Sequence, residues 1–166
     1  MRRPIVAVIG SGVATPEMVA IAKRAGEIVV ENGARLLTGG LGGVMAAASE
    51  GAAGAAHYRE GDVIGVLPGY ASADANPWVD IAIATGLGHA RNTVVVAAAD
   101  LVVLVGGDAG AMSEAGMALA IGRPLVIVKS TGTAGILGRA WSDRPGVTMV
   151  GVDGLAAEIR RLLGAP

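Results

Sequence analysis

One acidic residue, Glu114, follows a glycine-rich turn at a distance where a carboxylate can act on a bound ligand. Five apolar residues, Leu101 to Val105, run directly into Gly106-Gly107-Asp108-Ala109-Gly110, and an alanine-rich segment follows. This pattern is typical of a buried strand that leads into a helix, whose free N-terminal N–H groups can hold an anion. The segment therefore predicts a phosphate-type site with a candidate acid or base beside it.

Glycines follow two other apolar runs in the same way. Gly10-Ser11-Gly12 comes after the first run, and Gly39-Gly40-Leu41-Gly42-Gly43 comes after the second. In a parallel sheet all three turns lie at the carboxyl edge, where ligands bind. A single turn of this kind also serves tight backbone packing alone, because glycine has no Cβ. Three turns at one edge favour a nucleotide-like ligand.

Neither of the strict nucleotide-binding motifs is present. A P-loop carries Lys and then Ser or Thr after its last glycine, whereas Val44 follows Gly43. The dinucleotide fingerprint needs three glycines at fixed spacing and an acid about 20 residues later. The first turn lacks the third glycine, and the next acid is already Glu17. The sequence argues against a Walker-type ATPase and an ordinary NAD dehydrogenase.

Short apolar runs alternate with helical stretches along the chain, which predicts the elements that must position these turns. The expected strands are Ile5–Ile9, Arg35–Thr38, Val63–Leu67, Val79–Ala84, Leu101–Val105, Leu125–Val128 and Val147–Val150. The expected helices are Pro16–Asn32, Gly43–Ala56, Ala90–Ala98, Gly110–Ile121, Thr133–Trp141 and Leu155–Leu163. Continuously apolar strands indicate a parallel sheet covered on both faces. We predict one α/β domain over residues 1–166, a three-layer Rossmann-like sandwich of about seven mostly parallel strands with helices on both faces.

The composition limits the partners. Hydrophobic residues make up 52% of the chain and charged residues only 16%, so apolar surface is left for a partner copy to cover. We therefore predict a homodimer or a larger homo-oligomer. The net charge of −1, without a basic run, argues against nucleic acid as a partner. The absence of cysteine excludes disulfides and thiolate metal sites, and we expect no metal ligands.

Neither a membrane span nor a signal peptide is expected. No window free of charge, Gly and Pro reaches the roughly 20 residues that a span needs. The apolar run after Met1-Arg2-Arg3-Pro4 is too short for the core of a signal peptide. We expect a cytoplasmic protein that does not bind membranes.

Four segments together resemble a known family over nearly the whole chain: Thr38-Gly39-Gly40-Leu41-Gly42-Gly43-Val44-Met45, Ile64-Gly65-Val66-Leu67-Pro68-Gly69, Val79 to Asn92 with Gly88-His89-Ala90-Arg91, and Gly106 to Glu114. They are similar to the LOG family, long mislabelled as lysine decarboxylases, and more closely to its relatives, the molybdenum cofactor carrier proteins. The last segment takes the place of the LOG signature PGGxGTxxE.

The resemblance implies two functions. The carriers bind a pterin-dithiolene phosphate with its metal and do not turn it over, and this binding function is our first expectation. LOG enzymes hydrolyse the N-glycosidic bond of a cytokinin nucleoside 5′-monophosphate and release the base and ribose 5-phosphate, which is the alternative. Carried over to this chain, the catalytic arginine and glutamate are Arg91 and Glu114, and chemically a carboxylate suits the oxocarbenium-like sugar.

The same resemblance and the glycine turns imply a set of ligand-binding residues. They are Gly10, Ser11, Gly12, Thr38, Gly39, Gly40, Gly42, Gly43, Val44, Met45, Pro68, Gly69, His89, Asn92, Gly106, Gly107, Asp108, Ala109, Gly110 and Ala111. No cofactor is required for the expected function. The ligand is expected to be the molybdenum cofactor, molybdate or tungstate, a nucleotide, or a phosphate or sulfate ion.

The signature is altered in this chain. Gly106 replaces its proline, Asp108 its second glycine, and Ala111 its threonine, whose hydroxyl would be a phosphate ligand. A carboxylate at an anion site repels phosphate unless it points away or is paired. Like charges about 4 Å apart cost about 1 kcal/mol in water and about 4 kcal/mol at an effective dielectric near 20. These changes weigh against cytokinin-type hydrolysis.

Structural roles also fit the same residues. Arg91 is suited to pair with Asp80 or Asp100, and Glu114 to complement the dipole of its helix. Asp108 is equally suited to cap that helix. Both interpretations stay open for each residue at the level of sequence.

The irregular stretch from Pro68 to Pro77 reads as a loop, and Tyr70 and Trp78 lie in or beside it. Either ring could stack on a flat ligand. We expect the part of the pocket that selects the ligand to come from this loop and from the partner copy.

Overall fold

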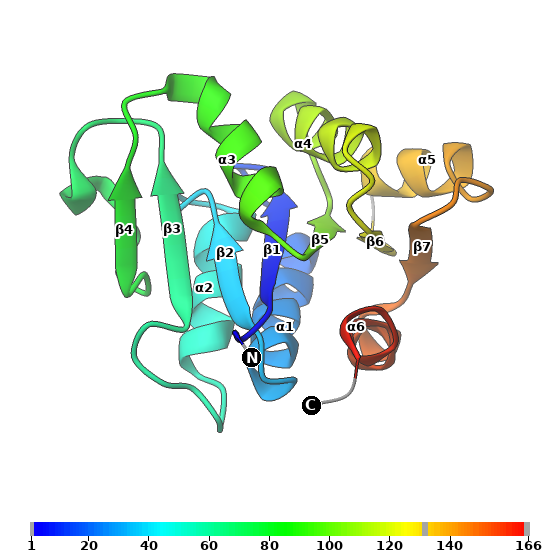
Figure 1. Cartoon of the computed structure of the whole chain (residues 1–166), viewed down its shortest axis with the longest axis horizontal. Helices are drawn as coiled ribbons and strands as arrows, with labels where there is room; N and C mark the ends of the chain where they lie inside the picture. Colours follow the sequence, from blue (N-terminus) through cyan, green and yellow to red (C-terminus); the bar gives the residue numbers. More distant parts are fainter. Residues whose placement is uncertain (1, 131–132, 165–166) are drawn as a thin grey trace.

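A seven-stranded sheet lies between two layers of helices in the computed structural model of the chain, which describes residues 2–130 and 133–164 (Figure 1). The strands are β1 (Ile5–Gly10), β2 (Arg35–Thr38), β3 (Val63–Leu67), β4 (Ile81–Ala84), β5 (Leu101–Val105), β6 (Leu125–Val128) and β7 (Val147–Val150). The helices are α1 (Pro16–Glu31), α2 (Val44–Ala53), α3 (Arg91–Ala98), α4 (Ala109–Ala120), α5 (Thr133–Ala140) and α6 (Leu155–Leu163).

The strand order is β4-β3-β2-β1-β5-β6-β7, and every pair of neighbours is parallel. The chain first builds outward from β1 to β4 and then returns to place β5 on the other side of β1 (Figure 1). This order puts the amino ends of all strands at one edge and the carboxyl ends at the other. The predicted Rossmann-like sandwich is confirmed, with a sheet that is entirely parallel.

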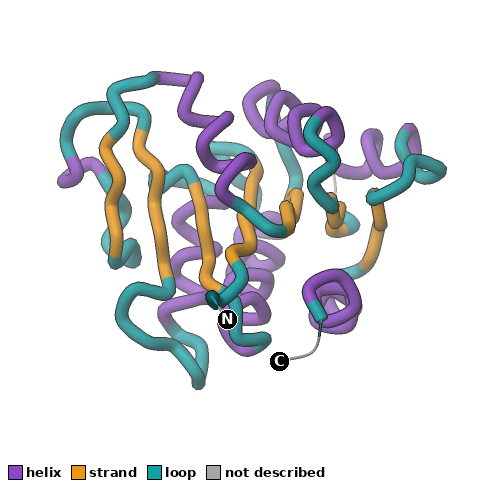
Figure 2. Tube along the Cα trace, viewed as in Figure 1, coloured by secondary structure: helices purple, strands orange, loops and turns teal. Residues whose placement is uncertain are grey.

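Helices lie on both faces of the sheet (Figure 2), and an apolar layer holds them there on each face. Val6 and Val8 face α1, α2 and α6, whereas Ala7 and Ile9 face α3, α4 and α5. Every residue of the inner strand β5 is fully buried, as expected for a strand that is covered on both faces. This burial on both faces explains the continuous apolar run in the sequence of β5.

The predicted boundaries agree with the observed ones to within a few residues. Thr15 caps α1 by accepting a hydrogen bond from the Met18 amide at 3.3 Å, and Pro16 is the first helical residue. The largest difference at a strand is β4, which begins at Ile81 instead of Val79. The Val79 amide donates to the Asn76 carbonyl and belongs to a turn, so it does not pair with β3.

Additional short 3-10 turns lie in connections that read as loops in the sequence. Ser72–Asp74 forms one inside the predicted loop, and Gly88–Ala90 forms another directly before α3. In the described ranges, no helix has the length and apolar character needed to cross a membrane.

Candidate functional site

The carboxyl ends of β1 and β5 mark the point where the strand order reverses. Gly10 of β1 lies in register with Val105 of β5. After these residues the two segments lead to helices on opposite faces of the sheet. In open α/β sheets, ligands bind in the crevice outside such a point. The topology thus brings the first and third glycine turns together.

A cavity of about 430 Å³ opens at this crevice. This volume lies in the range of small-molecule sites. The predicted site residues that line it come from β1 and the turn after it, the β2–α2 turn and α2, α3 with its preceding turn, and α4 with its N-cap: Gly10, Gly12, Gly39, Met45, His89, Arg91, Asn92, Asp108, Ala109, Gly110, Ala111 and Glu114.

Arg91 and Glu114 face each other inside the cavity. Arg91 is the first residue of α3, and Glu114 lies in the second turn of α4. Arg91 Nη1 lies 3.6 Å from Glu114 Oε1 and donates a 2.8 Å hydrogen bond to Asn92 Oδ1. Nη2 of the same guanidinium lies 3.8 Å from the Met45 sulfur, which is a weak acceptor. One edge of the guanidinium therefore keeps hydrogen-bonding capacity for a ligand.

Gly39 makes the position of Arg91 possible. A Cβ at Gly39 would overlap the guanidinium group, so a larger residue at this position would require the Arg91 side chain to move. The second glycine turn thus supplies space for a buried cation in addition to backbone N–H groups. Its glycine content has a steric cause at this position.

Glu114 is poised to change its charge near neutral pH. Burial raises its pKa to about 7; the positive charge of Arg91 acts against this shift, and the negative charge of Asp108 adds to it. Burial also lowers the pKa of Arg91, against the effect of Glu114, but a guanidinium still stays protonated. A buried carboxyl with such a pKa beside a cation in a cleft is a feature of functional sites.

Asp108 caps α4 and also binds the first glycine turn. Its Oδ1 accepts from the Ala111 amide at 3.1 Å, and its Oδ2 accepts from the Ser11 hydroxyl at 3.2 Å and the Gly12 amide at 3.3 Å. Burial raises the pKa of Asp108, but these hydrogen bonds outweigh it and hold the pKa below the ordinary value. The carboxylate is therefore charged at neutral pH.

The remaining residues of the β2–α2 turn lie outside the cavity lining. Thr38 is fully buried and its Oγ1 accepts from the Gly40 amide at 3.1 Å. Gly43 has φ +63 and caps α2, and the Val44 amide donates to the Ser11 carbonyl at 3.0 Å. Gly43 and Val44 thus tie this turn to the first one, and neither they nor Gly40 and Gly42 line the cavity.

Pro68 and Gly69 also lie outside the cavity lining. Their carbonyl groups accept from the amides of Gly88 and Gly86 at 3.0 and 2.9 Å. They therefore brace the segment that leads to Arg91. Of the predicted residues from this part of the chain, His89, Arg91 and Asn92 line the cavity.

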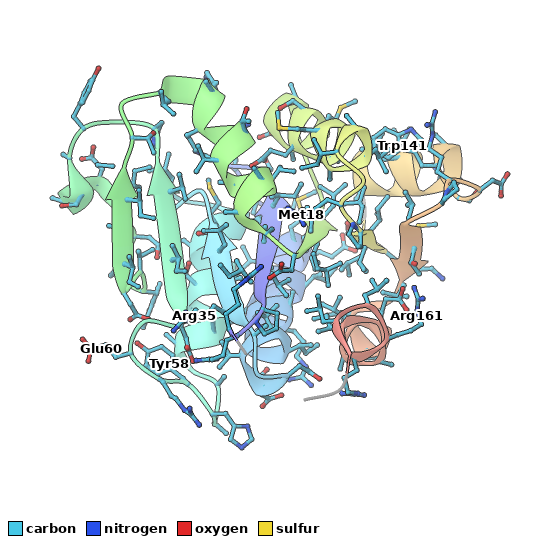
Figure 3. The ribbon with its side chains drawn as sticks, in the orientation of Figure 1. Met18, Arg35, Tyr58, Glu60, Trp141 and Arg161 are labelled. Atoms are coloured by element: carbon cyan, nitrogen blue, oxygen red, sulfur yellow. The ribbon has the colours of Figure 1, made fainter. Side chains whose placement is uncertain are left out.

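Gly106 and Gly107 form the turn below α4 and do not line the cavity either. The Gly106 amide donates to Ser130 Oγ at 3.1 Å. The side chain of Met18, labelled in Figure 3, lies against the Gly106 backbone from the α1 side. The turn is thus held by Ser130 and packed by Met18.

The alternative partners of Arg91 are occupied elsewhere. Asp80 accepts from the Tyr58 hydroxyl and from two backbone amides, and Tyr58 lies at the amino-terminal end of the strands (Figure 3). Asp100 pairs with Arg2 and accepts from the Ile5 amide. Both acids lie far from the cavity lining, and the carboxylate that Arg91 faces is Glu114.

The aromatic side chains lie outside the cavity. Tyr70 is 90% exposed, with its ring over Gly86. Trp78 lines a second, open hollow of about 420 Å³ on the α1 and α2 side, which shares Gly12 with the first. The loop expected to select the ligand contacts the second glycine turn, because Asn76 donates to the Gly40 carbonyl, and its role in selection stays a prediction.

Val8 and Ile9 line the cavity and were not predicted as site residues. They are the last apolar residues before the first glycine turn, and their sequence signal is that of core residues. Only the strand order reveals that this strand ends at the reversal point. Among residues 2–130 and 133–164, no group of three or more His, Asp or Glu side chains gathers as a metal site would require.

The comparisons with known proteins agree with this architecture. The model of the SLOG cluster4 family matches residues 3–151. The molybdenum cofactor binding protein of Rippkaea orientalis is 34% identical, with 98% of this chain and 99% of that chain covered and a TM-score of 0.87. The molybdenum cofactor carrier protein of Chlamydomonas reinhardtii is 33% identical, with the same coverage and a TM-score of 0.85.

A protein of Archaeoglobus fulgidus, described only as an uncharacterized protein, is 40% identical over 124 residues, which are 75% of this chain and 79% of that protein. The resemblance to LOG-like proteins and to the carriers, drawn from the sequence motifs, is confirmed by these matches.

Proposed function

Because the chain belongs to the SLOG cluster4 family, we propose that it binds and carries a small phosphorylated ligand of the molybdenum cofactor type in the cavity between Arg91 and Asp108. The observation that carries the proposal is the match over 98% of the chain to two proteins that bind this cofactor. The cavity at the strand reversal point adds independent support, since this is where such folds hold ligands.

The residues of the cavity suit an oxyanionic, partly apolar ligand. Arg91 offers a planar cation with an edge turned toward a weak acceptor, which a phosphate or an oxo-anion can displace. Met45, Ala109 and Ala111 give apolar lining for a flat or aliphatic part of the ligand. Nothing in this arrangement requires turnover, so storage and transfer are sufficient functions for it.

Titration of the purified protein tests the proposal. We expect saturable binding of the molybdenum cofactor and weaker binding of molybdate and tungstate. Calorimetry or equilibrium dialysis measures both. Binding should weaken at least tenfold in Arg91→Lys, which keeps the charge but loses the planar fork. Absence of saturable binding of all three probes would contradict the proposal.

Hydrolysis of a nucleoside 5′-monophosphate is a second candidate function, and Glu114 is the observation that favours it. With a pKa near 7, this buried carboxyl is available both as an acid and as a base at neutral pH. The water oxygen would form a bond to the sugar carbon as the carbon–nitrogen bond to the nucleobase breaks, and one proton of the water would pass to the leaving nucleobase. Free base released from a nucleotide panel by the wild type, and absent in Glu114→Gln, would establish this activity.

We propose that two copies associate through the face covered by α3 and α4. Exposed apolar side chains lie on β4, before α3, on α4 and at its C-cap: Ile81, Ile83, Leu87, Met112 and Ile121. Such a surface is usually covered by a partner.

The cytoplasmic location expected from the sequence stays a prediction.

A further inference from the structure

The hydrogen-bond donors that could bind an anion at the strand reversal point already bind a residue of the chain itself. Asp108 accepts hydrogen bonds from the first turn of α4 through Ala111, and from the β1–α1 turn through Ser11 and Gly12. These are the backbone and hydroxyl groups that would hold an external oxyanion at this place. The carboxylate thus stands where the anion of a ligand would otherwise lie.

The charge of Asp108 is balanced by these donors and not by Arg91. In the described part of the chain Asp108 forms no ion pair, whereas Arg91 directs its nitrogens toward Glu114, Asn92 and Met45. The cavity therefore has two unlike ends. A cation lies beside Gly39 at one end, and a carboxylate joins the two turns at the other.

We propose that Asp108 determines the ligand specificity of this cavity: it excludes phosphate from the N-terminus of α4, directs the ligand's anionic group to the Gly39–Arg91 end, and leaves its own end for hydroxyl or amino groups that donate hydrogen bonds. The inference rests on the proposed function for the identity of the ligand. It concerns the orientation of that ligand, which the family match leaves open.

The competing interpretation is that Asp108 serves only as the helix cap. Capping requires one acceptor for the Ala111 amide, and Asn or Ser at this position would provide it equally well. The contacts of Oδ2 with Ser11 and Gly12 go beyond that requirement. A substitution that keeps the cap and removes the charge therefore separates the two interpretations.

The test is calorimetric titration of the full chain with inorganic phosphate at fixed pH and ionic strength. Asp108→Asn keeps the cap, and Asp108→Ser is a second capping variant in case the first one folds poorly. We expect both to bind phosphate about tenfold or more tightly than the wild type, from the relief of like-charge repulsion. Asp153→Asn removes the same charge from an exposed turn outside the cavity and should leave the affinity unchanged.

The dependence on Arg91 reports where the phosphate lies. Arg91→Gln should weaken phosphate binding about tenfold in the presence of Asp108, and by less than about threefold when it is combined with Asp108→Asn. If Arg91→Gln does not fold, Arg91→Lys replaces it. Unchanged phosphate affinity in both capping variants, or an equal effect of the Arg91 substitution in both backgrounds, would overturn the inference.

These outcomes are independent of cofactor carriage. A gain in phosphate affinity in Asp108→Asn, together with failure of the wild type to bind the molybdenum cofactor, would support the role of Asp108 and remove the proposed function. Cofactor binding without any gain in phosphate affinity would do the reverse.

Discussion

Arg91 Nη1 and Glu114 Oε1 lie 3.6 Å apart, and their side chains are only 11% and 7% exposed. The two residues come from different helices and meet above the carboxyl end of the sheet. The burial that brings them together keeps the pKa of Glu114 near 7 despite the adjacent cation. The pair is therefore a charged contact above about pH 7 and a cation beside a neutral acid below it.

The titration of Glu114 should be visible in the stability of the protein. Its pKa is 4.5 in the unfolded chain and about 7 in the folded one, so the folded state binds more protons between these values. Stability from this group is fully present below pH 4.5 and is lost as the pH rises through 7. Relative to wild type, Glu114→Gln should gain about 1 kcal/mol between pH 6 and pH 8 in urea unfolding.

Glu158 provides the control for this measurement. Its hydrogen bond with Arg161 lowers its pKa, so it stays ionised in both states over the same pH range. The free-energy difference between Glu158→Gln and wild type should stay constant from pH 6 to pH 8. A flat profile for Glu114→Gln as well would show that Glu114 titrates normally.

Gly39 should control anion binding through Arg91. In Gly39→Ala the added methyl group overlaps the guanidinium and must displace it from Glu114. Loss of a charge-assisted hydrogen bond of about 1.5–3 kcal/mol predicts at least tenfold weaker binding of molybdate. Gly151→Ala, where a Cβ meets nothing within 4 Å, should bind like wild type. Equal affinity in both variants would remove Arg91 from the binding site.

Ile83 should contribute to self-association. It is 44% exposed on the edge strand β4, on the face covered by α3. Ile83→Lys places a charge in the proposed contact and should convert dimers into monomers in sedimentation velocity experiments. Val19→Lys, at a 38% exposed position on α1 on the opposite face of the sheet, is the matched control and should remain dimeric. A monomeric wild type would refute the proposed dimer.

Periodicity and turn residues were enough to predict the fold. The apolar runs marked all seven strands, and inner strands such as β5 are apolar throughout because they are buried on both faces. The start of β4 was missed because Val79, although apolar, is held in a turn by Asn76. Turn hydrogen bonds of this kind depend on tertiary contacts that hydrophobicity does not encode.

The candidate site was only partly predictable. Motif spacing pointed to Arg91, Glu114 and Asp108, and all three line the cavity. Which acid faces Arg91 depends on the strand order, since Asp80 and Asp100 are equally plausible partners along the chain. The threefold contact of Asp108 could not be predicted either, because Ser11 and Asp108 meet only after the sheet has formed.

Retention of the molybdenum cofactor by a variant with a blocked cavity shows directly whether this cavity holds the ligand. Gly12 lines the cavity and a Cβ there meets nothing within 4 Å, so Gly12→Leu should fold and fill the opening. Gly151→Leu adds the same side chain outside the cavity. After incubation with cofactor and gel filtration, molybdenum and pterin should co-elute with wild type and Gly151→Leu but not with Gly12→Leu. Equal retention by all three proteins, or by none, would contradict the account.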